Sequence, residues 1–204
     1  MMQLLDQNFW DERWRNGQTG WDIGIPSPPL CDFARHHPDK TARILIPGCG
    51  NAHEAGYLWS LGFTNIDLVD ISPLAVQKMK DRYGSVNGPG IYCSDFFDWK
   101  GHYDLILEQT FFCALPRERR IDYSAHCAKL LSPGGILAGV LFASQFEQPG
   151  PPFGGDADEY RSLFSRDFDI LTLEPCYNSI PPRAGNELFV ILRCKGDAAR
   201  DSAV

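Results

Sequence analysis

The stretch that decides the fold runs from Arg43 to Asp70 and reads RILIPGCGNAHEAGYLWSLGFTNIDLVD. A short apolar run leads into the glycine-rich turn at 47–50, and a helix-like stretch and a second apolar run follow before Asp70. Strand, tight turn, helix, strand and acid, in this order, form the first half of a nucleotide-binding α/β unit. The acid stands 20 residues after Gly50, about where such folds bind ribose hydroxyls. The stretch therefore predicts an α/β fold with an adenosine-type ligand.

The glycine turn departs from the phosphate-binding pattern G-x-G-x-x-G. Gly48 and Gly50 keep the first spacing, but His53 stands where the third glycine belongs, and Glu54 adds a carboxylate at the start of the helix. A carboxylate there suits the helix dipole but repels phosphate. An adenosine without phosphates and with a positive centre, such as S-adenosylmethionine (AdoMet), fits better than a dinucleotide. The remaining alternative is a βαβ unit that binds no ligand here and whose glycines only make turns.

Length and composition indicate one globular domain over residues 1–204. The net charge is −7, and the only cluster of basic residues lies at 117–120, which argues against a nucleic acid or an anionic membrane as partner. The first residues lack the basic and apolar regions of a secretory signal, and no apolar run is long enough to span a membrane. We expect a cytoplasmic protein with a small-molecule substrate. The sequence does not indicate whether the protein is a monomer or an oligomer.

The cysteines are seven in number and scattered, without a C-x-x-C pair or a metal-like Cys/His spacing. This distribution is typical of reduced, mostly buried thiols, so we expect no metal site.

Further apolar runs and turn residues predict the rest of a Rossmann-like, doubly wound sheet of seven mostly parallel strands. The additional strands are expected at 91–93, 103–107, 136–142, 168–173 and 188–194. Helices are expected at 7–16, 29–37, 73–83, 116–131 and 156–164. The basic run at 117–120 is interpreted as a solvated helix face, 132–135 as a turn, the proline-rich stretch 145–155 as a loop that could cover substrate, and 196–204 as a flexible tail.

The N-terminal segment, residues 1–40, carries three tryptophans shortly before the glycine turn. Trp10 and Trp14 lie four residues apart and so share a helix face, and Trp21 follows in a loop. They can be packing residues that hold the N-terminal helix on the domain. Alternatively they form a helical lid over a cationic ligand, because a sulfonium over indole rings gains cation–π attraction of about 1–2 kcal/mol when desolvated.

Residues that follow the third and fourth strands are candidates for ligand contacts, because ligands bind at the carboxyl ends of parallel strands. Asp95 can accept a hydrogen bond from an adenine amino group and Phe96 can flank the ring, or the two are a solvated turn residue and a core residue. After the fourth strand, Gln109 and Thr110 can bind a ligand, and Glu108 is either a buried acid or a strand-end residue.

Several motifs together resemble the thiopurine S-methyltransferase-like group of class I AdoMet-dependent methyltransferases, and within it the halide and thiol methyltransferases. The matching pieces are FWDERW (9–14), GWD (20–22), IPGCG (46–50), VDIS (69–72), SDFF (94–97), TFFCAL (110–115), LSPGG (131–135) and SIPPRAGNE (179–187). They span nearly the whole chain in the expected order.

The resemblance implies a role for particular positions. The implied cofactor-binding residues are Trp10, Trp14, Trp21, Gly48, Asp70, Asp95, Phe96 and Gln109, and the substrate candidates are Thr110, Phe111 and Arg183. Gln109 stands where thiopurine enzymes tend to have arginine and plant halide enzymes tyrosine, which weighs against a carboxylated thiopurine. Arg183 matches a family arginine near the substrate pocket, although a surface loop cation is the alternative.

The implied activity is methyl transfer from AdoMet to a small nucleophile, a thiolate or a halide. Such nucleophiles need little or no general base, so we expect catalysis by alignment and desolvation and assign no catalytic residue. The alternatives are an O-methyltransferase of small acids or phenols and a non-catalytic AdoMet-binding protein.

Overall fold

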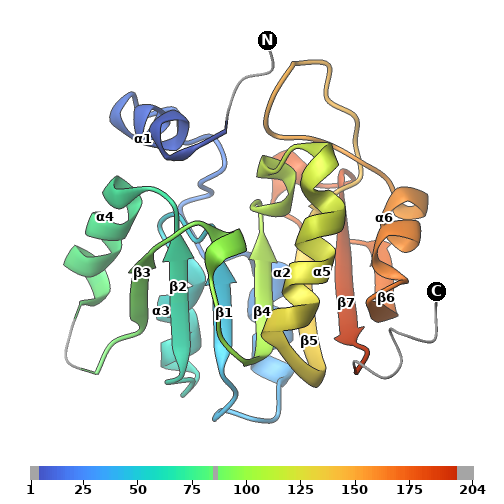
Figure 1. The fold of residues 1–204 in the computed structure, drawn as a ribbon, viewed down its shortest axis with the longest axis horizontal. Helices are drawn as coiled ribbons and strands as arrows, with labels where there is room; N and C mark the ends of the chain where they lie inside the picture. The colour runs from blue at the N-terminus through green and yellow to red at the C-terminus, as the bar shows by residue number, and fades with distance from the viewer. Residues whose placement is uncertain (1–4, 85–86, 197–204) are drawn as a thin grey trace.

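The apolar runs predicted as strands all pair into one seven-stranded sheet, in a computed structural model that describes residues 5–84 and 87–196 (Figure 1). The strands are β1 (Ile44–Pro47), β2 (Ile66–Asp70), β3 (Gly90–Cys93), β4 (Tyr103–Gln109), β5 (Leu131–Phe142), β6 (Phe168–Pro175) and β7 (Glu187–Cys194). Their order is β3-β2-β1-β4-β5-β7-β6, with β1 to β5 parallel and β7 antiparallel to both neighbours. The predicted mostly parallel sheet is confirmed.

The strand order creates a switch point between β1 and β4. The chain adds β2 and β3 on one side of β1 and then returns to place β4 on the other side. Loops that leave the carboxyl ends of β1 and β4 therefore diverge, and the crevice between them is where open α/β sheets bind ligands.

Helices cover both faces of the sheet (Figure 1). They are α1 (Gln7–Arg15), α2 (Pro28–His36), α3 (His53–Ser60), α4 (Pro73–Tyr83), α5 (Arg120–Leu130) and α6 (Ala157–Phe164). Because side chains alternate along a strand, Leu45 of β1 points to the core under α5 and α6, whereas Ile44 and Ile46 point to the core under α2, α3 and α4. This two-sided burial explains why the central strands read as unbroken apolar runs.

Local capping chemistry sets the helix starts. Ser72 caps α4 by accepting a hydrogen bond from the Ala75 N–H at 3.2 Å, with Pro73 in the first turn, as the sequence predicts. Asp156 caps α6 in the same way through Glu159. Helix α1 begins after Asp6, whose carboxylate accepts from the Phe9 N–H.

Two predicted boundaries were wrong. The helix expected from Pro116 begins as a 3-10 turn, and its α-helical part starts only at Arg120. The turn expected at 132–135 lies inside β5: pairing with β4 passes from Leu131 directly to Ile136, so the four residues bulge out of the ladder. Of the tail predicted at 196–204, all but the first residue lies outside the described residues.

The interpretation of the basic run as a solvated face was wrong for Arg120, which is only 2% exposed. Its guanidinium pairs with Glu159 of α6 and donates to the carbonyl oxygens of Phe153 and Gly154 at 3.1 and 3.0 Å. The physical reason is that α5 packs against α6 and the proline-rich loop, which together supply acceptors that sequence spacing does not reveal. Arg120 therefore fixes one end of that loop to α5.

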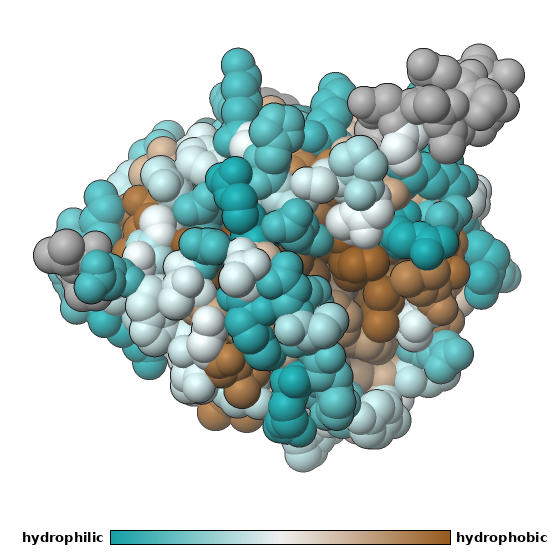
Figure 2. All heavy atoms as spheres, turned by 90° about the horizontal axis from the view of Figure 1, so that it is seen from below, coloured by the Kyte–Doolittle hydropathy of each residue, from teal (hydrophilic) through white to brown (hydrophobic). Residues whose placement is uncertain are grey.

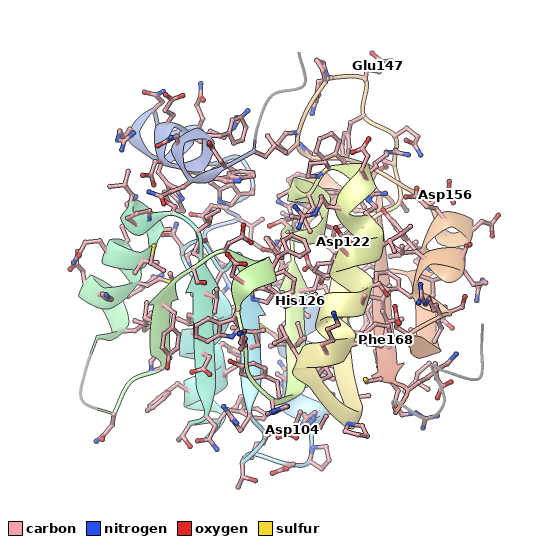
Figure 3. All side chains as sticks on the ribbon, in the orientation of Figure 1. Asp104, Asp122, His126, Glu147, Asp156 and Phe168 are labelled. Carbon is pink, nitrogen blue, oxygen red and sulfur yellow. The ribbon has the colours of Figure 1, made fainter. Side chains whose placement is uncertain are left out.

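The amino ends of the parallel strands lie at the lower end of the sheet (Figure 1). Asp104 lies at the lower end of β4 and Asp122 near the upper end of α5 (Figure 3). The lower surface is mostly hydrophilic, with apolar side chains gathered in a larger patch right of centre and in smaller groups at the left (Figure 2). No helix in the described ranges 5–84 and 87–196 has the length and apolar character needed to cross a membrane.

Candidate active site

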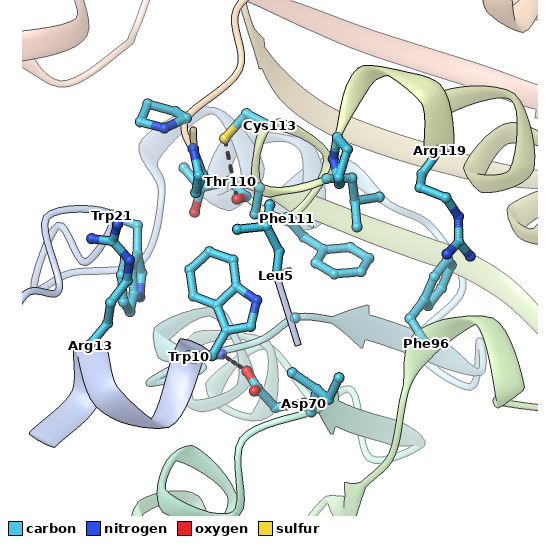
Figure 4. Close-up of a pocket in the computed structure, with 18 of the residues that line it drawn as sticks. Leu5, Trp10, Arg13, Trp21, Asp70, Phe96, Thr110, Phe111, Cys113 and Arg119 are labelled. Carbon is cyan, nitrogen blue, oxygen red and sulfur yellow. Dashed lines mark hydrogen bonds between the residues drawn. The ribbon is translucent and has the colours of Figure 1, made fainter. Parts of the chain in front are cut away.

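A cavity of about 520 Å³ lies at the carboxyl ends of the parallel strands, within the size range of small-ligand sites (Figure 4). Of the eleven residues that the sequence singles out, ten line it: Trp10, Trp14, Trp21, Gly48, Asp70, Asp95, Phe96, Thr110, Phe111 and Arg183. The segments that bring them together are α1 and the loop after it, the turns after β1 to β4, and the loop before β7.

The three tryptophans form one wall of the cavity. The Trp21 ring meets the Trp10 and Trp14 rings edge-on, with centroids 5.5 and 5.7 Å apart. Lys78 of α4 lies 4.5 Å from the Trp14 ring, so α1 packs on α4 as well as on the cavity. The tryptophans therefore both hold α1 on the domain and line the cavity. That α1 moves as a lid stays a prediction.

The glycine turn and Asp70 form the floor. Gly48 has φ +54°, and a Cβ there would lie 2.2 Å from the Phe111 ring, so only glycine fits. The buried Asp70 carboxylate accepts the Gly50 N–H at 2.9 Å and the Ser72 N–H at 2.8 Å. Burial raises its pKa, and the two hydrogen bonds act in the opposite direction. Each oxygen keeps a further lone pair, which a ribose hydroxyl can use.

The end of β3 supplies a second polar and aromatic corner. Asp95 is exposed and accepts the Phe97 N–H at 2.8 Å, while Phe96 is buried and lines the cavity. The Arg119 guanidinium covers the Phe97 ring at 3.8 Å and pairs with Asp122 at 3.0 Å. Asp95 is thus an exposed turn residue and also lines the cavity, so the two alternatives from the sequence do not exclude each other.

Glu108, at the end of β4, is a fully buried acid behind the cavity. One carboxylate oxygen accepts the N–H groups of Phe111 and Phe112 at 2.8 and 2.9 Å, and the other accepts the Tyr123 hydroxyl at 2.8 Å. Burial raises the pKa of Glu108 to about 7, against the effect of these hydrogen bonds. The contacts hold a turn in which Thr110 has φ +62°, a strained value for a β-branched residue. Glu108 therefore positions the cavity wall.

Gln109 is the predicted residue that the structure places elsewhere. It borders an adjoining small cavity of about 30 Å³, which shares Trp21, Gly48, Gly50 and Thr110 with the large one and is also lined by the His53–Asp22 pair, whose side chains meet at 2.8 Å. Glu54 borders the same small cavity and accepts the Ser27 N–H at 2.9 Å. Its charge therefore stands outside the large cavity, where Asp70 and Asp95 are the carboxylates that disfavour phosphate.

Sequence reasoning missed several residues of the large cavity: Leu5, Arg13, Gln18, Ser94, Phe97, Cys113, Leu115, Arg119 and Phe142. Arg13 was the one with a usable signal, because it lies three residues after Trp10 and so near the same helix face. Phe142 reaches the cavity from the end of β5, and Pro151 and Pro152 reach it from the predicted loop 145–155, whose role as a cover over substrate stays a prediction.

The residues present fit AdoMet. Asp70 offers acceptors for ribose hydroxyls, Asp95 an acceptor for the adenine amino group, and the tryptophans π faces for a sulfonium. The positive φ at Gly48 and Gly50 lets backbone approach the ligand closely.

Comparisons with known proteins agree with this geometry. The sequence profile described as "Thiopurine S-methyltransferase (TPMT)" matches residues 5–191. The chain belongs to the thiopurine S-methyltransferase family. The chain is similar to the "Probable thiol methyltransferase 2" of Arabidopsis thaliana, with 29% identity over 194 residues that cover 91% of this chain and 85% of the relative. The "Thiocyanate methyltransferase 1" of Brassica oleracea is 28% identical over 191 residues, 91% of this chain and 84% of the relative.

The fold of this family member also matches solved structures. A Burkholderia thailandensis 1,6-didemethyltoxoflavin-N1-methyltransferase, solved with bound 1,6-didemethyltoxoflavin and S-adenosylhomocysteine, superposes with a TM-score of 0.75. The superposition covers 93% of this chain and 87% of the other at 17% identity. The predicted class I fold, the methyltransferase activity and AdoMet as methyl donor are confirmed.

Proposed function

We propose that this methyltransferase transfers the methyl group of AdoMet to a small soft nucleophile that arrives as an anion, a thiolate, thiocyanate or a halide. The proposal treats the described chain as one catalytic domain, with Asp70 on the ribose, Asp95 and Phe96 on the adenine, and the tryptophans over the sulfonium. When bound, AdoMet supplies an electrophilic methyl group on a positively charged sulfur.

The observation that carries the proposal is the chemistry of the cavity wall beyond β4 and β5. Within the described chain, this part is lined by Thr110, Cys113, Phe142, Arg183 and apolar neighbours, without a carboxylate or an imidazole. A wall with no general base suits an acceptor that is already a nucleophile, and an apolar wall raises its reactivity by excluding water.

Arg183 supplies the positive charge of this wall. Its guanidinium donates to the Trp21 carbonyl oxygen at 3.0 Å, lies 3.5 Å from Glu187 and faces the Phe142 ring at 5.4 Å. These contacts hold it at the cavity, where it attracts an anionic acceptor. Burial and the nearby Glu108 raise the pKa of Cys113, so its thiol is neutral and does not compete as a nucleophile.

Related proteins support the acceptor class, since relatives are named as thiol, thiocyanate and thiopurine methyltransferases. All seven cysteines are free thiols, which supports a reducing, cytoplasmic location for the enzyme.

The test is an AdoMet consumption screen over sulfide, aryl thiols, thiocyanate, iodide, phenols and small carboxylic acids. We expect turnover with the first four, a rate that is flat between pH 6 and pH 9 for thiocyanate and iodide, and a rate that follows thiol ionisation for the thiols. Arg183→Gln should raise KM for the anions, with Arg193→Gln, an exposed arginine of β7, as the matched control. Turnover confined to phenols and acids would contradict the proposal in favour of O-methylation, and no turnover would favour a binding protein.

A further inference from the structure

Three guanidinium groups line the large cavity, and two of them have carboxylate partners. Arg119 pairs with Asp122 at 3.0 Å, and Arg183 lies 3.5 Å from Glu187. Arg13 of α1 pairs with no carboxylate among the residues that the structure describes, and its buried Nε has no hydrogen-bond partner. A buried N–H of a charged group is costly when unpaired, so Arg13 is a donor prepared for a ligand.

The surroundings of Arg13 leave the edge of its guanidinium available. One face of the group lies over the Phe9 ring at 4.5 Å. This contact fixes the plane of the guanidinium but uses none of its N–H donors, which lie in the plane. A planar fork of N–H groups matches the two oxygens of a carboxylate.

The position of Arg13 selects which part of the donor it meets. In Figure 4, Arg13 rises from α1 beside Trp21, Phe96 and Arg119 lie at the opposite end, and Asp70 lies between the two ends. This order follows the sheet, since Phe96 follows β3, Asp70 ends β2 and the glycine turn follows β1.

A donor with adenine at the end of β3 and ribose at the end of β2 extends its amino-acid part toward the turn after β1. That turn faces the N-terminal tryptophans: a Cβ on Gly50 would lie 3.6 Å from Trp21 Nε1 and 3.8 Å from the Trp14 ring. Arg13 precedes Trp14 on α1 and lines the same end of the cavity. The acids Asp70 and Asp95 lie toward the adenosine, where Arg119 is paired with Asp122, so the guanidinium without a carboxylate partner among the described residues lies at the amino-acid end (Figure 4).

We propose that Arg13 binds the α-carboxylate of AdoMet and so ties the N-terminal helix α1 to the amino-acid end of the donor. The inference rests on the donor assignment in the proposed function. The charge of Arg13 is then neutralised only when donor is bound, which couples the position of α1 to donor binding.

The test compares two ligands that differ in the amino-acid part. S-adenosylhomocysteine carries the carboxylate, and 5′-methylthioadenosine keeps the adenosine and sulfur without it. Calorimetry on the intact protein should show that Arg13→Gln lowers the affinity for S-adenosylhomocysteine about 10- to 100-fold. This is the loss expected for a charge-assisted hydrogen-bonded pair. Its affinity for 5′-methylthioadenosine should stay within about 2-fold of wild type, because that ligand makes no contact with Arg13.

Two further variants make the result specific. Arg13→Lys keeps the charge but not the fork, so it should lose less than Arg13→Gln does. Arg15→Gln is the matched control: Arg15 lies on the same helix, its side chain is 59% exposed and lies 3.5 Å from the buried Asp11 carboxylate, and neither residue lines the cavity, so both affinities should be unchanged. Thermal unfolding of each variant checks that α1 remains folded.

Three results would overturn the inference. Equal losses for both ligands in Arg13→Gln would mean that Arg13 only supports the cavity wall. Unchanged binding of both would mean that Arg13 meets no donor group. Unchanged donor affinity with a raised KM for anionic acceptors would assign the charge to the acceptor instead. Failure of the donor assignment itself is separate, since wild-type protein would then bind neither ligand.

Discussion

Replacing Glu108 with glutamine should remove a pH-dependent loss of stability. The pKa of Glu108 is raised to about 7 in the folded protein, mainly by burial, from 4.5 when unfolded. Below pH 4.5 the group is protonated in both states and burial carries no ionisation cost. Between pH 4.5 and 7 the unfolded chain has released the proton that the folded chain still binds, so stability falls as pH rises through this window.

The size of the effect follows from the two pKa values. Each pKa unit corresponds to about 1.4 kcal/mol, so this group lowers the free energy of unfolding by about 2–3 kcal/mol between pH 5 and pH 8. Glutamine cannot ionise, yet its carbonyl oxygen can accept the N–H groups of Phe111 and Phe112, and its amide can donate to Tyr123. Any cost of turning the Tyr123 hydroxyl is the same at both pH values and cancels.

The assay is urea unfolding of wild type and Glu108→Gln at pH 5 and pH 8. The wild type should lose about 2–3 kcal/mol more than the variant does over this interval, a difference of about 1 M in urea midpoint. Glu174→Gln, an exposed carboxyl on β6, should behave like wild type. An equal loss in wild type and Glu108→Gln would refute the reasoning, because Glu108 would then titrate alike in both states.

Three other substitutions test the site and its support. Asp70→Ala should abolish AdoMet binding in calorimetry, and retained affinity would contradict the ribose assignment. Gly48→Ala should lower the free energy of unfolding by about 2–4 kcal/mol, because of the positive φ and the contact with Phe111. Gly62→Ala, with a positive φ and open space around it, should lower it by only about 1–2 kcal/mol. Equal losses would mean that the Phe111 ring moves freely. Arg120→Ala should cost about 3 kcal/mol, because three hydrogen bonds of a buried cation are lost, and a loss below about 1 kcal/mol would show that the loop does not depend on it.

Much of the fold follows from local signals. The apolar runs and the cap at Ser72 are local patterns, and the glycine turn and Asp70 stand at a spacing of 20 residues that the strand–turn–helix–strand unit fixes. The central strands are buried on both faces of the sheet, so successive side chains are all apolar. A continuous apolar run of this kind is recognisable in the sequence. Ten of the eleven predicted site residues line the large cavity because parallel strands bring their carboxyl ends to one edge.

Only the tertiary structure decided what each charged side chain meets. Arg120 belongs to a run that is usually solvated, but Glu159, 39 residues away, and a loop carbonyl make it a buried cation. Gln109 ends β4 and Thr110 follows it with a left-handed backbone; both border the small cavity, but only Thr110 also lines the large one.

The sequence by itself thus determined the sheet and the donor-binding edge, because turn chemistry and hydrophobic periodicity act over a few residues. It did not determine the polarity of the cavity. The unpaired state of Arg13 and the paired states of Arg119 and Arg183 depend on which carboxylates the folded chain brings near each guanidinium. Electrostatic pairing acts between segments far apart in sequence, and only the packing of those segments sets the distances.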